Sequence, residues 1–267
     1  MGSREIDSRR LRLVAELIAV RIGDKLFESA KRLVEERRGD LVWSFDVFSE
    51  KTALELIKLL VPKSIVISEE RGIVRLSDDP EYVVLLDPVD GSNNFAHDIP
   101  WFCTCVAIAP IDARSLDDIV ASAVYAPTIT KIFSYSREEG ALVNGKSIER
   151  SRPKKIISAY FDTSAQFQVL ERYCRLRGGG LRVRSLGSIA LELCYVAWGR
   201  LEGVIDLRKR LRNTDIAAPY PILLASGATV VTDSPIPATS FVQGFELAAF
   251  YSSELADVYR RARSAEA

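Results

Sequence analysis

The stretch Leu85-Leu86-Asp87-Pro88-Val89-Asp90-Gly91-Ser92-Asn93-Asn94-Phe95 decides the fold of this chain of 267 residues. It begins as an apolar strand and then places two carboxylates, Asp87 and Asp90, around a proline. Pro88 and Gly91 favour a turn at this point, because proline fixes one backbone torsion and glycine tolerates a left-handed conformation. The end of the strand therefore directs several polar groups toward one place, which predicts a functional site.

The same stretch offers ligands for both a phosphate and a metal ion. The backbone N–H groups of Gly91 and Ser92 stand at the start of a short predicted helix, whose positive end suits a phosphate. Asp87, Asp90 and the Val89 carbonyl supply the hard oxygen atoms that Mg²⁺ prefers. A bare D-P-x-D sequence also occurs in ordinary turns, where an aspartate caps a helix. The longer motif favours the metal and phosphate site over that simple turn.

Other carboxylates stand at the ends of predicted elements elsewhere in the chain. Glu69 and Glu70 follow the apolar run Ser64–Ser68, Asp46 precedes a predicted helix, and Asp215 opens another. Taken singly, they have ordinary explanations as a solvated strand end, a helix N-cap and a favourable charge at a helix N-terminus. Brought together with the two aspartates of the turn, they would form a multi-metal cluster that binds phosphate and activates water.

Hydrophobic periodicity predicts a layered α/β architecture. Helical spacing runs over residues 11–34, with a stop at Gly39, and over residues 47–60, 165–176, 188–197, 215–225 and 253–263. Apolar and β-branched runs predict strands over residues 64–68, 82–86, 102–109, 119–125, 131–135, 156–161, 181–183 and 203–205. Asn144-Gly145 predicts a hairpin turn.

The best domain boundary is Ser151-Arg152-Pro153. It divides the chain into an N-terminal α+β subdomain, residues 1–152, and a C-terminal α/β subdomain, residues 153–267. The first carries most of the candidate metal ligands, and the second is expected to complete the site.

Charge and composition exclude several classes of protein. Lys+Arg 36 against Asp+Glu 36 gives a formal net charge of zero, which argues against a nucleic-acid binder. No apolar run approaches the roughly 20 residues of a membrane span, and the N-terminus lacks the apolar segment of a signal peptide. We therefore expect no membrane partner and a cytoplasmic location. A single methionine and few Asn and Gln residues favour a thermophilic source.

The four cysteines form neither a zinc pattern nor a disulfide framework. Cys103 and Cys105 have C-x-C spacing with no second pair or histidine beside them, so no zinc site is expected. For Cys174 and Cys194 two alternatives stay open: a disulfide or buried thiols. Intracellular proteins of thermophiles do form disulfides. We favour the thiols.

These residues resemble the inositol monophosphatase family of magnesium-dependent, lithium-sensitive phosphatases. The family signature D-P-[IV]-D-G-[ST]-x-N-F matches residues 87–95, and His97 and Pro100 follow where the family tends to have them. Further matches lie in the family's order at residues 40–46, 69–70, 187–188 and 215–218. The resemblance implies an αβαβα sandwich of helical layers and mixed β-sheets, and a homodimer.

The resemblance also implies which residues hold the metal ions. Ligands of a first Mg²⁺ would be Glu69, Asp87 and the Val89 carbonyl. Ligands of a second Mg²⁺ would be Asp87, Asp90 and Asp215. Two or three Mg²⁺ ions per site are implied.

Catalytic and substrate-binding roles carry over in the same way. Glu69 and Ser92 would orient the attacking water, with Asp46 supporting Ser92 or holding a weaker third Mg²⁺. The substrate would be bound by Asp90, Gly91, Ser92, Gly187, Ser188, Arg208 and Asp215. The implied reaction is in-line attack of a metal-activated water on phosphorus, with no covalent enzyme intermediate.

The region before Asp215 departs from the family pattern. Members that prefer inositol phosphate have a glutamate about seven residues before the matching aspartate, where it receives a ring hydroxyl, whereas this chain has Arg208. Arginine accepts no hydroxyl proton but binds phosphate in a fork, so we expect Arg208 to bind a second phosphate of the substrate. Here the chain resembles the archaeal branch, which acts on both fructose 1,6-bisphosphate and inositol monophosphate. We expect Lys209 and Arg212 to lie on a solvated face.

The leading hypothesis is a Mg²⁺-dependent phosphomonoester hydrolase of small sugar phosphates: fructose 1,6-bisphosphate, inositol 1-phosphate, or both. A second hypothesis is a 3′-phosphatase of adenosine 3′,5′-bisphosphate, which would need room for an adenine beside Gly187-Ser188. A third is a catalytically weak protein that keeps the fold to bind a metal or an RNA partner, and the neutral charge and intact acidic set argue against it. His97 is expected to be structural, and Trp101 and Phe102 to pack in the core.

Overall fold

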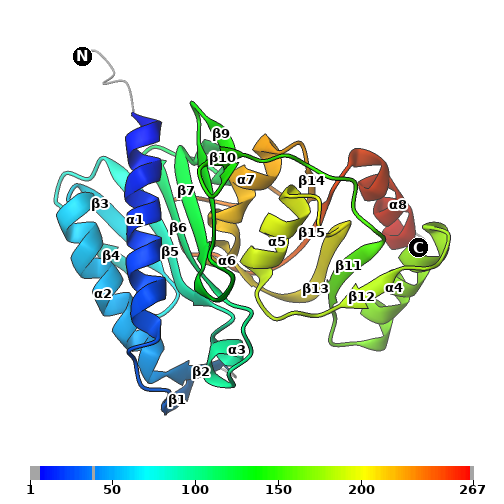
Figure 1. Ribbon diagram of the computed structural model, residues 1–267, viewed down its shortest axis with the longest axis horizontal. Helices are drawn as coiled ribbons and strands as arrows, with labels where there is room; N and C mark the ends of the chain where they lie inside the picture. Colours follow the sequence, from blue (N-terminus) through cyan, green and yellow to red (C-terminus); the bar gives the residue numbers. More distant parts are fainter. Residues whose placement is uncertain (1–6, 38–39, 265–267) are drawn as a thin grey trace.

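The protein folds into five layers, alternately helical and β-sheet, which follow one another from left to right in Figure 1. The computed structural model describes residues 7–37 and 40–264. In this part of the chain, two long helices cover the outer face of an eight-stranded sheet, and two helices together with the short α6 (Asn213–Ala217) lie between it and a five-stranded sheet. Two more cover the outer face of the five-stranded sheet. This arrangement confirms the expected αβαβα sandwich.

The eight-stranded sheet carries most of the candidate ligands. Its strands in spatial order are β10 (Lys146–Ser147), β9 (Gly140–Val143), β8 (Lys131–Ser136), β7 (Ala121–Ala126), β6 (Cys103–Pro110), β5 (Tyr82–Asp90), β3 (Ser64–Ser68) and β4 (Gly72–Arg75). Neighbours are antiparallel except β3 and β5, which run parallel with Ser68 opposite Leu86. These two strands therefore end at the same edge. Asn144 and Gly145, both with positive φ, form the predicted hairpin turn.

The five-stranded sheet completes the cleft described below. Its strands in spatial order are β12 (Arg182–Arg184), β11 (Ile156–Tyr160), β13 (Gly203–Arg212), β15 (Gln243–Phe250) and β14 (Thr229–Val231). The first three run parallel, and β15 is antiparallel to both of its neighbours. The sequence did not predict β15, because its Leu-Ala-Ala segment lacks the β-branched residues that favour strands.

Each helical layer buries an apolar stripe against a sheet. The outer helices of the first sheet are α1 (Ser8–Leu26) and α2 (Ser44–Leu60), the middle ones are α5 (Ile189–Ala197) and α7 (Pro219–Ala225), and the outer ones of the second sheet are α4 (Ser164–Leu176) and α8 (Ser253–Ser264). In β5, Val84 and Leu86 pack with α1 and α2, whereas Val83 and Leu85 pack in the middle layer. Because both faces of β5 are buried, its sequence is apolar without alternation.

Two helix predictions differ from the structure, one in its C-terminal end and one in its continuity. α1 ends at Leu26 rather than near residue 34, because the N–H and the hydroxyl of Ser29 both donate to the Leu26 carbonyl and turn the chain. The next residues form β1 (Leu33–Arg37), which pairs with β2 (Asp40–Trp43). The single helix predicted over residues 215–225 is in fact α6 (Asn213–Ala217) followed by α7, because Pro219 has no N–H to continue the first helix.

The expected boundary falls between the two sheets. The first sheet ends at Ser147 in sequence, and the second begins at Ile156. The core between them is continuous, however, since residues of both sheets pack there with α5 and α7. The division at residue 152 therefore stays a prediction.

Cys174 and Cys194 do not form a disulfide. Both are free thiols, and they lie in different helical layers, Cys174 on α4 and Cys194 buried on α5. The thiol alternative was therefore the better one. Within residues 7–37 and 40–264, no helix has the length and apolar character that crossing a membrane requires.

Candidate metal centre

The carboxyl ends of β3 and β5 open into a cleft of about 1230 Å³ that residues of both sheets line. The predicted metal ligands Glu69, Asp87, Val89, Asp90 and Asp215 all line this cleft. The other predicted residues that line it are Asp46, Gly91, Ser92, Gly187 and Arg208. Ser188 is fully buried behind the cleft surface.

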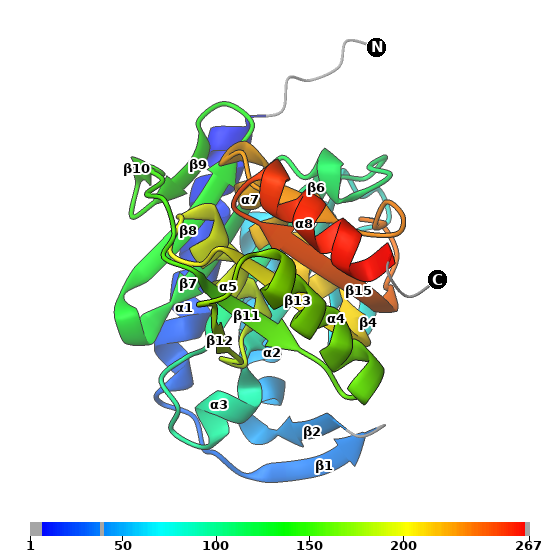
Figure 2. The ribbon, with the colours of Figure 1, turned by 90° about the vertical axis from the view of Figure 1, so that its right-hand side faces the viewer.

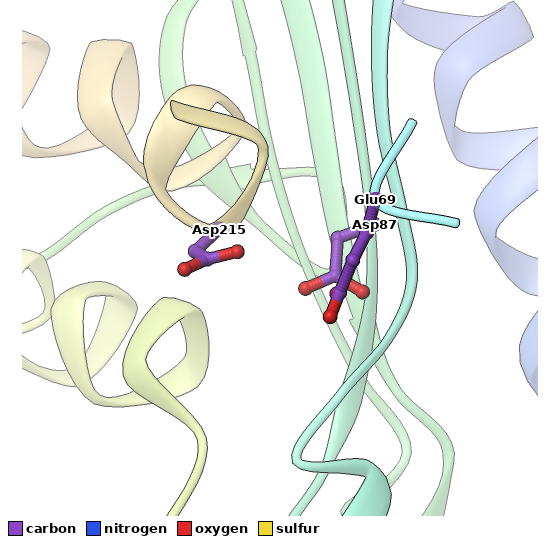
Figure 3. A group of neighbouring side chains, drawn as sticks. All are labelled: Glu69, Asp87 and Asp215. Atoms are coloured by element: carbon purple, nitrogen blue, oxygen red, sulfur yellow. The ribbon is translucent and has the colours of Figure 1, made fainter. Parts of the chain in front are cut away.

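Three carboxylates converge within this cleft, as Figure 3 shows. One oxygen from each of Glu69, Asp87 and Asp215 lies within 4.8 Å of the others. Glu69 directly follows β3, and Asp87 lies one residue beyond the Ser68–Leu86 pair, so the parallel pairing of the strands brings these two together. Asp215 comes from α6 and points toward them across the cleft. This set of oxygen donors fits a divalent cation.

A β-bulge in β5 turns both aspartates of the D-P-x-D sequence toward the cleft. Residues three apart on a regular strand face opposite sides of a sheet. Here Asp87 pairs with Cys105 and Asp90 with Cys103, so β5 has one residue more than β6 over this interval. The extra residue puts the two aspartates on a common face. Pro88 stands within the bulge, where its missing N–H costs no ladder hydrogen bond.

Asp90 is held by the start of α5. Its Oδ2 accepts hydrogen bonds from Ser188 Oγ at 2.5 Å and from the Ala190 N–H at 2.8 Å. Cys103 Sγ contacts the same oxygen at 3.6 Å. The Ser188 hydroxyl, predicted to bind substrate, thus orients Asp90 in this structure.

Burial makes the ionised forms of these carboxylates costly. It raises the pKa of Asp90 to about 6 and that of Asp215 to about 7, against an ordinary 3.8. Burial also raises the pKa of Glu69 and of Asp87 well above their usual range, and the neighbouring acids raise both further. Arg212 pairs with Glu69 and opposes the shift of its pKa. The residues therefore fit Mg²⁺ both by donor type and by the positive charge they need.

Asp46 and Ser92 line the cleft, but no hydrogen bond joins them in the part of the chain that the structure describes. Asp46 is the third residue of α2 rather than its N-cap, and its Oδ2 accepts the Trp43 N–H at 2.9 Å. Burial raises the pKa of Asp46 to about 7. Ser92 begins α3 (Ser92–Ala96) after Gly91. Gly91 has a φ of 90°, and a Cβ there would lie 3.2 Å from the Gly187 carbonyl, so the turn requires glycine.

Figure 2 shows α3 and the β1–β2 hairpin at the same end of the molecule. His97, which follows α3, is exposed, and its ring meets the Trp43 ring edge-on with the centroids 6.0 Å apart. It is not among the residues that line the cleft, which agrees with a structural role.

The two aromatic residues predicted to pack in the core do so to different extents. Phe102 is buried as expected, and Trp101 is half-buried against the central core.

The pairing of β13 with β15 is interrupted by a bulge a few residues before Asp215. Asp206 pairs with Leu247, but the next pair is Leu211 with Phe245, so β13 has three residues more than β15 over this interval. The wide bulge displaces residues 208–210 from the sheet and toward the cleft, which all three of them line.

Arg208 is held rigidly at the cleft wall. Its Nε and Nη2 donate to the two oxygens of Asp206 at 3.1 and 2.6 Å, and its guanidinium lies 4.3 Å from the centre of the Tyr160 ring. Lys209 is solvated as expected, with a side chain 69% exposed. For Arg212 that expectation was wrong, because its side chain is 20% exposed and pairs with Glu69.

Glu50 is a site residue that sequence reasoning missed. It is buried on α2 and accepts from the Ser68 hydroxyl, from the Arg71 N–H at 3.1 Å and from Arg71 Nε at 3.0 Å. Ser68 and Arg71 lie on either side of Glu69 in the sequence. Glu50 therefore fixes the turn that carries Glu69, a candidate metal ligand.

Glu192 is a second such residue. Its Oε1 accepts from the Tyr160 hydroxyl at 2.6 Å and from the Leu186 N–H at 3.0 Å. The sequence could have indicated its burial, because Glu192 stands between Leu191 and Leu193 in an otherwise apolar helix. A buried acid of this kind requires partners.

Residues 5–264 match the sequence model of a protein family described as "Inositol monophosphatase family". The chain belongs to this family. The fructose-1,6-bisphosphatase of Pyrococcus furiosus is 37% identical over 166 residues, which cover 62% of this chain and 60% of that relative's length. The fructose-1,6-bisphosphatase/inositol-1-monophosphatase of Methanocaldococcus jannaschii is 32% identical over 198 residues, which cover 73% of each. A solved structure titled a hypothetical protein from Pyrococcus horikoshii with similarities for inositol-1 monophosphatase has a TM-score of 0.78 at 29% identity, covering 96% of this chain and 99% of that one.

Metal binding should stabilise this member of the inositol monophosphatase family. We expect Mg²⁺ or Mn²⁺ to raise the melting temperature, because a ligand of the folded state at about 100 times its Kd adds about 2.7 kcal/mol. Asp87→Asn should lose most of this gain while leaving the metal-free protein at least as stable, since it removes one of several mutually repelling buried charges. Thermal unfolding with and without metal measures both effects.

Asp112→Asn is the matched control. Asp112 is exposed and is not among the residues that line the cleft, so this variant should keep the full metal-induced shift. An Asp87→Asn protein that metal stabilises as much as the wild type would place the ion elsewhere.

Glu192 should make stability depend on pH. Burial raises the pKa of Glu192 to about 7 from an ordinary 4.5, and Tyr160 and Asp90 are the titratable groups that act on it. A carboxyl whose pKa is raised on folding stabilises the protein below its unfolded pKa, and that contribution is lost as the pH rises through its folded pKa. Glu192→Gln keeps an acceptor for Tyr160, so from pH 5 to pH 8 it should gain stability relative to the wild type, on the order of 2 kcal/mol.

Urea unfolding of both proteins at pH 5 and pH 8, with saturating Mg²⁺, measures this difference. A stability gap between the two proteins that stays constant across that range would contradict the raised pKa.

Proposed function

We propose that the protein is a Mg²⁺-dependent phosphoric monoester hydrolase of small sugar phosphates. The observation that carries this proposal is the convergence of Glu69, Asp87 and Asp215 in one cleft. The same cleft is lined by the first residue of α3 and by the guanidinium of Arg208. Oxygen donors for a cation beside N–H and guanidinium donors for an anion suit a phosphate ester, whose hydrolysis rests on positioning and electrostatics.

The protein residues would divide the work of the reaction. Mg²⁺ held by Glu69, Asp87, Asp90, Asp215 and the Val89 carbonyl would lower the pKa of water and neutralise charge on the phosphate. The N–H groups of Gly91 and Ser92 would donate to a phosphate oxygen. The Glu69 carboxylate would accept a proton of the attacking water, which the Ser92 hydroxyl would help to orient. Two Mg²⁺ ions, with a third weakly held near Asp46, agree with the number of acids.

Arg208, at the wall of the cleft, favours a substrate with two phosphates. Arg208 presents a cation whose direction is fixed by Asp206 and Tyr160, and a planar guanidinium binds phosphate in a fork. Gly187, which also lines the cleft, would contact the sugar. Two relatives named fructose-1,6-bisphosphatase support this choice, and one of them is also named inositol-1-monophosphatase.

The other two hypotheses are less favoured. Neither relative described above is named for adenosine 3′,5′-bisphosphate. A catalytically weak partner of metal or RNA would not need every predicted acid to line one cleft. We further propose a cytoplasmic homodimer with small-molecule partners, from a thermophilic source, on the grounds of composition and family resemblance.

Phosphate release from a substrate panel tests the function. We expect Mg²⁺-dependent release from fructose 1,6-bisphosphate and inositol 1-phosphate, weaker release from adenosine 3′,5′-bisphosphate, and at least about 1000-fold lower turnover in Asp87→Asn, because a lost ligand removes the metal's contribution to transition-state stabilisation. An absence of Mg²⁺-dependent release from all three substrates would overturn the proposal.

Arg208→Gln tests the distal phosphate site. A charge-assisted fork contributes about 1.5–3 kcal/mol, so KM for fructose 1,6-bisphosphate should rise about 10- to 100-fold. Inositol 1-phosphate has no second phosphate, and its KM should change less than about threefold. Steady-state kinetics on both substrates measure the contrast.

Arg210→Gln is the control on the same bulge. The Arg210 side chain is 66% exposed and pairs with Asp162 at 2.9 Å, so its loss should change both KM values little. Equal effects of Arg208→Gln on the two substrates would remove Arg208 from the distal site.

A further inference from the structure

Tyr160, the last residue of β11, contacts two separate parts of the cleft. Its side chain is largely buried, and its hydroxyl accepts the Gly187 N–H at 2.7 Å and donates to Glu192 Oε1 at 2.6 Å. A phenol has one proton to donate, and this bond uses it. The ring of the same residue lies under the guanidinium of Arg208.

The hydroxyl fixes the turn that orients Asp90. Gly187 has a φ of 91°, and a Cβ there would meet the Asn94 side chain at 2.8 Å, so the turn has no spare room. The next residue, Ser188, donates to Asp90 Oδ2 at 2.5 Å. If the Gly187 N–H loses the Tyr160 hydroxyl, the turn can shift, and the Ser188 hydroxyl that orients Asp90 shifts with it.

The ring fixes the guanidinium of Arg208, which also lines the cleft. Asp206 holds Arg208 in its plane by two hydrogen bonds, and the Tyr160 face, 4.3 Å from the guanidinium carbon, blocks movement out of that plane. An aliphatic side chain at position 160 would keep some bulk but would lose the stack.

We propose that Tyr160 is a positioning residue with two separable effects: its hydroxyl sets the affinity of the metal centre through Gly187, Ser188 and Asp90, and its ring sets the affinity for the distal phosphate through Arg208. The second effect rests on the proposed function, whereas the first requires only that the acidic cluster binds a divalent cation.

The hydroxyl is tested by Mn²⁺ binding, measured by electron paramagnetic resonance on folded protein without substrate. Tyr160→Phe should weaken Mn²⁺ binding about 10-fold, as loss of a residue that supports a metal ligand generally does. Tyr173→Phe is the matched control, because the Tyr173 hydroxyl donates to the buried Glu202 at 3.1 Å and is not part of the cleft. It should leave the Mn²⁺ affinity unchanged.

The ring is tested by comparing two variants. Tyr160→Phe keeps the stack, so its KM for fructose 1,6-bisphosphate at saturating Mg²⁺ should stay within about twofold of the wild type, whereas Tyr160→Leu should raise it about fivefold. Inositol 1-phosphate should show no such step between the two variants. If Tyr160→Leu fails to fold, Tyr160→Met, which also lacks an aromatic face, replaces it and should raise this KM by a similar factor.

Each outcome decides one part of the proposal. Mn²⁺ affinity within twofold of the wild type in Tyr160→Phe, or an equal loss in Tyr173→Phe, would overturn the hydroxyl's role. Equal KM values for Tyr160→Phe and Tyr160→Leu would overturn that of the ring. If the wild type releases no phosphate, the proposed function fails while the Mn²⁺ result still stands, and binding of the bisphosphate in the presence of Mn²⁺ replaces KM.

Discussion

The burial of like charges is the constraint on which this structure depends. Glu69, Asp87 and Asp215 place carboxylate oxygens within 4.8 Å of one another, where each ionised group repels the others and burial adds to the cost of ionisation. The fold imposes this arrangement through the parallel pairing of β3 with β5 and through α6, which approaches from the other side of the cleft. This repulsion destabilises the metal-free cluster, and a bound cation would relieve it. The same electrostatic free energy would therefore contribute to the affinity for a metal.

The acids are held in place by residues one contact away from them. The turn that carries Glu69 is fixed by Glu50, Asp90 is fixed by the start of α5, and Asp215 accepts the Arg212 N–H at 2.8 Å. Each of these contacts removes freedom that a carboxylate would otherwise use to move away from its neighbours. The positions of the candidate ligands therefore depend on these supporting residues as much as on the ligands themselves.

The sequence revealed the part of the site whose signals are local. Residues 85–95 combine strand, turn and helix start in one stretch, so their pattern alone predicted the two aspartates and the phosphate turn. Arg212 was misjudged because its partner, Glu69, lies 143 positions away, and nothing near Arg212 distinguishes a paired arginine from a solvated one. The first helix was extended too far for a related reason: apolar spacing continued into residues 33 and 34, and only the tertiary structure shows them in a strand.

The proposed distal-phosphate residue and a proposed metal ligand lie on different parts of the chain segment that leads into α6. Asp215 is fixed by the Arg212 N–H at the end of β13, whereas residues 208–210 bulge out of the ladder before that point. Under the proposed function, a substitution at Arg208 should therefore change which anion the cleft accepts without moving Asp215. A net charge of zero is compatible with an anionic substrate, because it sums Lys+Arg 36 and Asp+Glu 36 over the whole chain, whereas the basic residues of the bulge line the cleft directly.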